Sequence, residues 1–269
     1  MLCEELIVVR GGGDIATGTI HRLWRSGFRV LVLELPNPSA IRRRVAVSEA
    51  MFQGSTEVEG MRAVRIECPA ELDAVLLRNE VPVLQDPAGE SISRLRPSVL
   101  VDAILAKRNC GTTRGMAPLT IALGPGFTAG VDADFVIETQ RGHDLGRIIT
   151  AGSAAQNTGV PGLIAGQGAL RVIHAPESGC IHNRCEIGES VREGELLATI
   201  GETEVRASLS GVLRGIIRDG YPVERGLKIA DIDPRISEQK NCSTISDKSR
   251  CIAGSVLELL CRHRYQQLK

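Results

Sequence analysis

The first part of the chain alternates short apolar runs with segments of helical periodicity. Residues 6–10 form an apolar run that is typical of a parallel strand buried on both faces. From Asp14 to Trp24 the apolar residues recur at helical spacing, and Gly27 ends this segment. Residues 28–35 form a second apolar run, so the pattern predicts a strand–helix–strand unit of about 30 residues.

The same alternation continues through the following residues. It predicts strands at 64–68, 81–85, 98–105, 119–123 and 135–139, and helices at 40–51 and 70–79. Strands that alternate with helices indicate a mostly parallel sheet. We therefore expect an α/β fold, with a Rossmann-like nucleotide-binding module over residues 1–166.

The pattern changes after about residue 166, where short strands separated by Gly and Glu replace the helical periodicity. Residues 175–201 align without gaps with residues 207–233, which indicates an internal repeat. We expect two such halves to pack into a small all-β module over residues 167–235. The repeat resembles a barrel-sandwich hybrid of the biotinyl/lipoyl type, but its hairpin at 201–204 has no Lys to carry a cofactor.

Residues 236–269 are expected to form a polar linker and a C-terminal helix. Ile252, Val256, Leu259 and Leu260 make one apolar stripe of that helix. A stripe of this kind must be covered, and docking back on the first module is the simplest arrangement.

Composition and charge narrow the classes of function. Apolar residues make up 43% of the chain, but aromatic residues only 3%, and single-stranded nucleic-acid binding needs aromatic stacking surfaces. The 32 basic residues balance the 32 acidic ones, so no net charge attracts a polyanion. We see no membrane-length apolar stretch and no secretory leader, and the eight cysteines are dispersed, so we expect a cytoplasmic protein with reduced thiols.

The turn after the first strand is the strongest motif. Its candidate cofactor-binding residues are Gly11, Gly12, Gly13, Asp14 and Ile15, in a GxGxxA pattern. Glycines let the backbone approach a pyrophosphate, and the helix dipole favours the anion. Glu34 ends the next strand, where an acid can bind a ribose. The alternative is a tight turn of an α/β sheet that binds no ligand. Asp14 also weakens the nucleotide-binding interpretation, because its negative charge would repel a phosphate.

A basic run follows at Arg42, Arg43 and Arg44. Arg43 is a candidate for contact with phosphates or with a 2′-phosphate. The alternative is a solvated charged face of a helix.

Further polar residues are predicted to lie just beyond strand ends, where open α/β sheets bind ligands. They are Asp86, Lys107, Arg108, Asn109, Glu138, Arg141 and His143, and the Gly124–Gly126 loop is expected there too. His143, with Arg141 nearby, is the best acid/base candidate, and Cys110 is a candidate reactive thiol. Their spacing matches no known catalytic arrangement, so whether the protein is an enzyme stays open.

Cys180, His182 and Cys185 could bind a metal if all three converged on one ion. The repeat argues against this, because the two cysteines align with Val212 and Ile217 and should occupy apolar positions. We therefore expect no metal site.

Several long blocks together, including VVRGGGDIATGTIHRL, VDAILAKRN and TISDKSRCIAGSVLE, resemble the YqeB family. The resemblance covers nearly the whole chain. It implies an accessory role in maturation or cofactor insertion for selenium-dependent molybdenum hydroxylases. The implied partners are a nucleotide-type small molecule and a hydroxylase or another maturation factor. The implied cofactor is a molybdopterin dinucleotide, whose pyrophosphate the glycine turn could hold.

Two other functions remain open at this stage. One is an NAD(P)-dependent oxidoreductase in which Glu34 contacts the ribose. The other is a scaffold in which the glycine turn no longer binds anything.

Overall fold

The computed structural model describes residues 5–159 and 166–267 and divides into two compact units. The first unit comprises Met1–Pro38, Ala46–Asn157 and Ile245–Lys269, and the second comprises Ser39–Val45 and Thr158–Thr244. The chain therefore leaves the first unit and returns to it for the last helix.

A nine-stranded sheet forms the centre of the first unit. Its strands are β1 (Leu6–Arg10), β2 (Arg29–Glu34), β3 (Ser55–Val58), β4 (Met61–Ile66), β5 (Val81–Gln85), β6 (Val99–Asp102), β7 (Leu119–Leu123), β9 (Phe135–Ile137) and β10 (Ile148–Ile149). Their order is β10-β9-β7-β6-β1-β2-β5-β4-β3, and β8 (Thr128–Ala129) pairs separately with β11 (Gly152–Ser153). All pairs are parallel except β3 with β4 and β9 with β10, so the edges of the sheet are antiparallel.

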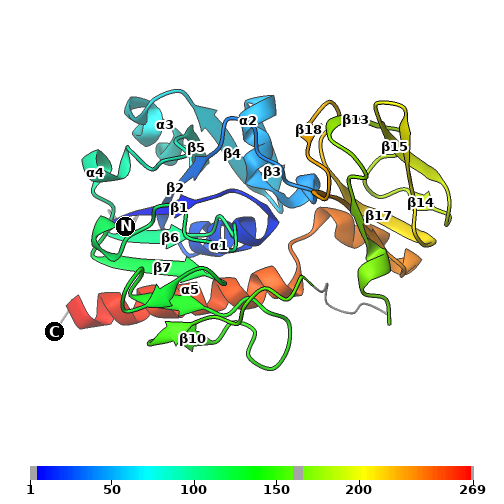
Figure 1. The fold of residues 1–269 in the computed structure, drawn as a ribbon. Coiled ribbons are helices and arrows are strands. Elements are labelled where there is room, and N and C mark those ends of the chain that lie inside the picture. The colour runs from blue at the N-terminus through cyan, green and yellow to red at the C-terminus, as the bar shows by residue number, and fades with distance from the viewer. Residues whose placement is uncertain (1–4, 160–165, 268–269) are drawn as a thin grey trace. The chain divides into compact units, whose positions relative to one another are not determined.

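Helices cover both faces of this sheet (Figure 1). They are α1 (Asp14–Arg25), α2 (Ala50–Gln53), α3 (Leu72–Leu77), α4 (Ile92–Leu95) and α5 (Asp247–Gln267), with short 3-10 turns η1 (Arg43–Val45), η2 (Val47–Glu49), η3 (Pro69–Glu71) and η4 (Arg114–Met116). Leu72 of α3 and Ile92 of α4 join Val8, Leu31 and Leu100 in one buried cluster. The central parallel strands β1, β2, β6 and β7 bury residues on both faces, as a parallel sheet between helices requires.

The long helix α5 packs along α1. Ile252 and Val256 of α5 and Ile20 of α1 are fully buried. A Cβ atom on Gly18 would lie 2.6 Å from the Cβ of Ser249, so glycine at this position lets the two helix backbones approach.

The expectation of a Rossmann-like module is wrong in its topology. A Rossmann sheet has the strand order 3-2-1-4-5-6, so the third parallel strand along the chain lies directly beside the second. In this sheet the third parallel strand along the chain is β4, and it does not lie beside β2. Here β5 lies between β2 and β4, and antiparallel strands extend both edges, giving a large mixed sheet. The local β1–α1–β2 unit was predicted correctly, but a local unit does not determine the order of the strands that follow it.

The second unit consists of two four-stranded antiparallel sheets. Its strands are β12 (Val172–His174), β13 (Gly179–Asn183), β14 (Ser190–Val191), β15 (Leu196–Ile200), β16 (Thr203–Arg206), β17 (Gly211–Ile216), β18 (Pro222–Val223) and β19 (Lys228–Asp233), with 3-10 turns η5 (Ala169–Arg171) and η6 (Ile236–Ser243). The orders are β12-β19-β17-β14 and β16-β15-β13-β18. Strands β13, β14 and β15 recur 32 residues later as β17, β18 and β19, so the sequence repeat has a structural counterpart.

The expected biotinyl/lipoyl barrel is wrong for this unit. The strands form two separate sheets around one apolar core, to which Ile181, Leu197, Leu213 and Ile229 contribute, and not one closed barrel. The repeat predicts paired halves, but it does not specify which strand of one half pairs with the other half.

Several elements match their sequence predictions, and one does not. The strands expected at 81–85 and 119–123 have the expected bounds, and Pro69 begins the segment that continues as α3. The helix expected over 40–51 is wrong, because Val45, Ala46 and Val47 are buried in succession and the backbone forms short turns instead.

Candidate functional site

Gly11, the first glycine of the turn, packs against the chain's own backbone. Its φ of +95° lies in the region that favours glycine, and its N–H donates to the Leu33 carbonyl at 2.8 Å. A Cβ atom here would lie 2.9 Å from the Ala103 carbonyl oxygen. The close approach that the glycine permits is therefore made by the loop after β6.

Gly12 is enclosed in the same way. Its N–H donates to Oε2 of Glu34 at 2.6 Å, and its carbonyl accepts from the Ser48 N–H at 2.9 Å. A Cβ atom at Gly12 would meet Ser48, Val47 and Glu34 at 3.0–3.2 Å. Groups of the chain itself thus fill the space beside Gly12.

Glu34 holds this turn closed. Its second carboxylate oxygen, Oε1, accepts from the Leu35 N–H at 2.7 Å, and the side chain is buried. Burial raises the pKa of Glu34, while the hydrogen bonds from Leu35 and Gly12 act in the opposite direction. Both oxygens accept from backbone N–H groups, which leaves the carboxylate bound to the protein and not to a ribose.

Only the third glycine of the turn is open. Gly13 is the N-cap of α1, and a Cβ atom added to it would meet no atom within 4 Å. Asp14 and Ile15 begin the first helical turn, and Asp14 provides the acidic group that favours a helix N-terminus.

Behind the turn, Arg10 is almost completely buried at the end of β1. It donates to Oγ1 of Thr112 at 2.6 Å and to the carbonyls of Pro87 and Cys110. Thr112 in turn donates to Asp102 at 2.6 Å. This network fastens the loop after β6 to the end of the sheet.

The loop after β6 contains two non-glycine residues with positive φ, Leu105 at 59° and Lys107 at 63°. Asn109 accepts from the N–H groups of Gly111 and Thr112 through its side chain, and so shapes the loop. Lys107 and Arg108 are exposed, and Cys110 is half-buried.

The Gly124–Gly126 loop packs against the loop after β6. A Cβ atom on Gly126 would lie 2.6–2.8 Å from the Arg108 backbone, and one on Gly124 would lie 2.6 Å from Oγ1 of Thr139. The predicted close approach of the Gly124–Gly126 loop is thus to protein backbone and side chain.

Two acids expected at strand ends cap their own loops. Asp86 accepts from the N–H groups of Gly89, Glu90 and Ser91, and the hydrogen bonds outweigh the effect of burial to keep its pKa low. Glu138 accepts from Gln140 and Ala155. Both carboxylates are therefore used in loop structure.

The remaining candidates at the sheet edge do not form one site. Arg141 makes two hydrogen bonds to Asp247 of α5, at 2.6 and 2.8 Å. His143 is exposed on the same loop. Arg43 donates to the Ile216 carbonyl at 2.9 Å, inside the second unit.

The cysteine motif does not assemble a metal site. Cys185 is buried, as expected, but Cys180 is exposed on β13 together with His182, so the prediction of an apolar position for Cys180 is wrong. Among the described residues, no group of three or more His, Cys, Asp or Glu side chains is placed to hold a metal ion.

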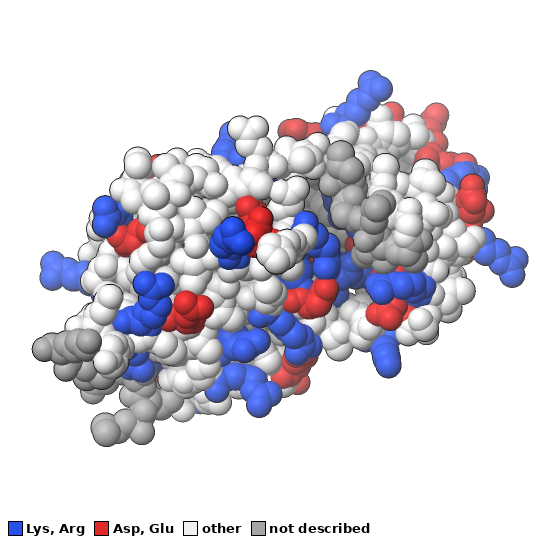
Figure 2. Space-filling model, turned by 90° about the horizontal axis from the view of Figure 1, so that it is seen from below, with Lys and Arg blue, Asp and Glu red and all other residues white. Residues whose placement is uncertain are grey.

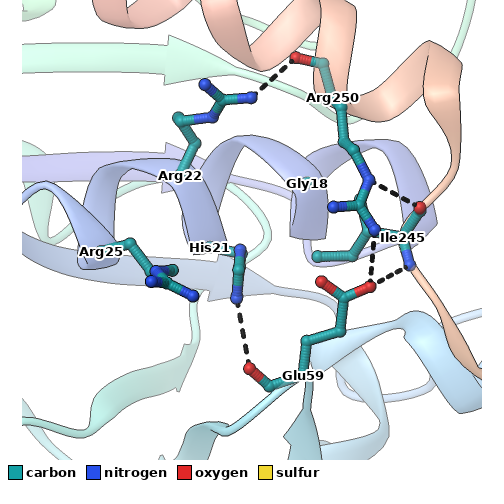
Figure 3. A pocket seen from close by; sticks show the side chains of 7 residues that line it. All are labelled: Gly18, His21, Arg22, Arg25, Glu59, Ile245 and Arg250. Carbon is teal, nitrogen blue, oxygen red and sulfur yellow. Dashed lines mark hydrogen bonds and ion pairs between the residues drawn. The ribbon is translucent and has the colours of Figure 1, made fainter.

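A pocket of about 270 Å³ lies between α1, the β3–β4 turn and the start of α5, and we call it the arginine pocket (Figure 3). Its lining residues are Gly18, His21, Arg22, Arg25, Glu59, Ile245 and Arg250. The four α1 residues recur three and four positions apart, so they lie on one stripe of the helix. All seven belong to the first unit.

Glu59 connects the walls of the arginine pocket. Its carboxylate Oε1 accepts from the Ile245 N–H at 2.8 Å and from Nη2 of Arg250 at 2.9 Å. Arg22 donates to the Arg250 carbonyl at 3.5 Å, whereas Figure 3 draws Arg25 without a bond to another lining residue. Three guanidinium groups thus share one pocket with one carboxylate.

His21 contributes a neutral donor or acceptor. Burial lowers the pKa of His21, Arg25 and Arg250 lower it further, and the contacts with Glu59 act in the opposite direction. Its Nε2 lies 3.3 Å from the Glu59 carbonyl, and because a carbonyl can only accept, we infer that Nε2 carries the proton. The other ring nitrogen, Nδ1, then has a lone pair when the ring is neutral.

The sequence predictions did not include the arginine pocket. His21, Arg22 and Arg25 resemble the ordinary polar face of an amphipathic helix. The one local signal for the pocket is the Glu59–Gly60 turn between two strands. The sequence prediction missed this turn because it did not include the strand β3. Nothing local places Arg250 beside residues almost two hundred positions earlier in the chain.

Comparison with known proteins gives one sequence relative. The chain is 48% identical over 266 residues to "Uncharacterized protein YqeB" of Escherichia coli (strain K12), a match that covers 99% of this chain and 49% of that protein. The chain thus spans about half the length of this relative. No family model matches the sequence.

Solved structures show weaker likeness. The ectoine utilization protein EutE (DoeB) from Ruegeria pomeroyi covers 84% of this chain and 85% of its own, at 11% identity and a TM-score of 0.26. A succinylglutamate desuccinylase/aspartoacylase from Rhodobacter sphaeroides covers 85% of both chains, at 13% identity and a TM-score of 0.26. An aspartoacylase family protein from Mesorhizobium loti covers 79% of this chain and 59% of its own, at 13% identity and a TM-score of 0.25.

These findings correct the expected function. Gly11 and Gly12 of the predicted nucleotide-binding turn are closed by backbone and side chains of the chain itself. A nucleotide-binding maturation factor, an NAD(P)-dependent oxidoreductase and a link to selenium or molybdenum are therefore unsupported. Within the described ranges, no helix is both long and apolar enough to cross a bilayer. The 48% identity over 99% of this chain supports its membership of the YqeB family.

Proposed function

We propose that this protein binds a small anionic metabolite in the arginine pocket. The observation that carries the proposal is the gathering of Arg22, Arg25 and Arg250 around one cavity with a single acid, Glu59. Guanidinium groups present planar forks of N–H donors that match carboxylate and phosphate oxygens. The ligand would carry groups of one of these two kinds.

The charge of the pocket is local. The chain has equal numbers of basic and acidic residues, and Figure 2 shows both signs on one face, with several basic side chains gathered together. With no overall charge to attract anions, an affinity for anions would have to come from such a cluster.

Size limits the ligand. Pockets for drug-sized ligands measure roughly 300–1,000 Å³, so a cavity of about 270 Å³ suits a metabolite of modest size. Of the seven lining residues that the structure describes, none is a Ser, Thr, Cys or Lys nucleophile. These features favour binding over covalent catalysis.

Calorimetric titration at fixed ionic strength tests this function. The probes are inorganic phosphate, a small phosphate monoester, a dicarboxylate such as succinate, and chloride as the control anion. The informative variant is Arg25→Ala, since Arg25 bonds to no other lining residue in Figure 3 and its loss should leave the fold intact.

Arg94→Ala is the matched control, because Arg94 is exposed on α4, away from the pocket, and its replacement changes the net charge equally. We expect Arg25→Ala to weaken binding about threefold to tenfold, the usual contribution of one charge-assisted contact. Arg94→Ala should leave affinity within about twofold. Absence of binding to every probe, or equal loss in both variants, would refute the proposal.

A further inference from the structure

Glu59 has an unusual backbone for its residue type. It is the first central residue of the two-residue turn between β3 and β4, where Val58 pairs with Met61. Glu59 has φ +47° and Gly60 has φ +81°, so both central residues lie in the left-handed region. Turns of this kind strongly favour Asn, Asp or Gly at the first position, and a glutamate there carries a conformational cost.

The side chain of this residue enters the arginine pocket (Figure 3). Its carboxylate bridges the Ile245 N–H and the Arg250 guanidinium, at 2.8 and 2.9 Å. The Glu59 side chain is 22% exposed, whereas that of Arg250 is 51% exposed. A carboxylate in this place is itself an anion bound to a guanidinium of the site.

We propose that Glu59 is a built-in competitor for the anion site, and that the site selects a dianion. This inference rests on the anion-binding function proposed above. An incoming anionic group takes Arg250 in place of the Glu59 carboxylate, so that the affinity of the pocket is set below what its arginines alone would give.

Charge balance indicates the ligand class. Three arginines and one glutamate leave two positive charges in the lining, and burial lowers the pKa of His21, which favours its neutral form. A phosphate monoester or a dicarboxylate neutralises both charges, while a monocarboxylate leaves one uncompensated. The phosphate monoester is the better candidate, since one compact group can accept from several guanidinium donors at once.

The strain at Glu59 is consistent with this role. Residues held in sparsely populated backbone regions persist where the surrounding structure determines them, and they cluster at ligand-binding sites. Asn or Gly would form the same turn with less strain. Neither would bring a carboxylate to Arg250.

Glu59→Gln tests the competition directly. The amide keeps the length of the side chain and an oxygen that can accept from the Ile245 N–H, but it removes the negative charge. Glu57→Gln is the matched control, since Glu57 is exposed on β3, two residues away, and its replacement changes the net charge equally. Affinities for a phosphate monoester, succinate, acetate and chloride are measured calorimetrically for wild type and both variants.

We expect Glu59→Gln to bind the phosphate monoester about threefold to fivefold more tightly than wild type, because a partly exposed ion pair is worth up to about fivefold in affinity. Acetate should bind more weakly than either dianion in wild type, and Glu57→Gln should match wild type within about twofold. Unchanged or weaker monoester binding in Glu59→Gln would refute the competitor role. Equal binding of acetate and the dianions would refute the selectivity.

The outcomes separate this inference from the function on which it rests. If wild type and Glu59→Gln both bind no anion, the anion-binding function itself is wrong. If wild type binds anions and Glu59→Gln binds them no better, only the competitor role is wrong. Circular dichroism and thermal melting of each variant show whether the β3–β4 turn survives the substitution.

Discussion

Replacing Gly11 with alanine distinguishes a structural turn from a ligand-binding one. Gly11 has φ +95°, and a Cβ atom would lie 2.9 Å from the Ala103 carbonyl oxygen and 3.0 Å from Cα of Ile104. The atoms in the way belong to backbone that the buried network of Arg10 and Thr112 fastens to the sheet. The loop therefore cannot move aside easily.

The size of the effect follows from two terms. A non-glycine residue at positive φ costs about 1–2 kcal/mol. Forcing a methyl group into a closely packed site costs about 1–3 kcal/mol. We expect Gly11→Ala to lower the free energy of unfolding of the first unit by about 2–4 kcal/mol, allowing for partial relaxation.

Trp24 provides the assay. It is the single tryptophan of the chain, it lies in α1, and its indole N–H donates to the Asn79 carbonyl at 2.8 Å. Its fluorescence during urea denaturation therefore reports on the first unit and not on the second. The midpoint and slope give the free energy of unfolding by linear extrapolation.

Gly13→Ser is the matched control on the same turn. Gly13 is an N-cap with extended backbone and open space around its Cβ position, so a serine can accept from the first N–H groups of α1. We expect it to be stabilising by about 0.5–1 kcal/mol. If Gly11→Ala stayed within about 0.5 kcal/mol of wild type, the turn would have room for a side chain, and the structural interpretation would be refuted.

Two further predictions concern buried groups of the first unit. Thr112→Val keeps the shape of the side chain but leaves Arg10 and Asp102 without their shared hydroxyl. Urea denaturation should therefore show that this variant loses about 2–5 kcal/mol of the free energy of unfolding, whereas Thr112→Ser should lose about 1 kcal/mol. Because burial raises the pKa of Glu34, the folded state holds that proton more tightly than the unfolded chain; the associated stability is present in acid and is lost as pH rises through the folded pKa. Denaturation curves should therefore show that the free energy of unfolding of Glu34→Gln increases relative to that of wild type from acid to neutral pH. A difference between the two that does not change with pH would contradict the raised pKa.

Local patterns predicted individual elements of the fold. The apolar run at 6–10 and the helical spacing after Asp14 predicted β1 and α1, because burial on both faces and burial of one stripe leave distinct periodicities. The strand at 81–85 was predicted with its bounds for the same reason. The repeat was visible because equivalent strands need equivalent turn glycines.

Arrangement in space was not predictable in this way. The position of β5 between β2 and β4 depends on which strand edges are free when the sheet forms, and no periodicity encodes that. The sequence correctly identified the glycine turn as a place of close backbone approach, but it did not identify the groups that approach. These groups are Ala103 at Gly11 and Ser48 at Gly12. The same string of glycines serves a ligand or a loop equally well.

The arginine pocket could not be predicted from local sequence patterns either. Its parts come from α1, a hairpin turn and the start of α5, and each part is ordinary alone. Arg250 meets Glu59 only because the last helix packs along α1. Contacts of such high sequence separation follow from tertiary packing, which single-sequence patterns do not report.

The return of the chain to the first unit also sets an order of events during synthesis. Residues 158–244 are made before Ile245, Arg250 and the rest of α5. Until then, the ribosome-bound first unit has a sheet and α1 but lacks the helix that covers Ile20, and its anion site lacks one wall. The second unit has a core of its own and can fold in the meantime, since domains generally fold as units. Anion binding would thus become possible only after the second unit has been synthesised and α5 has followed it.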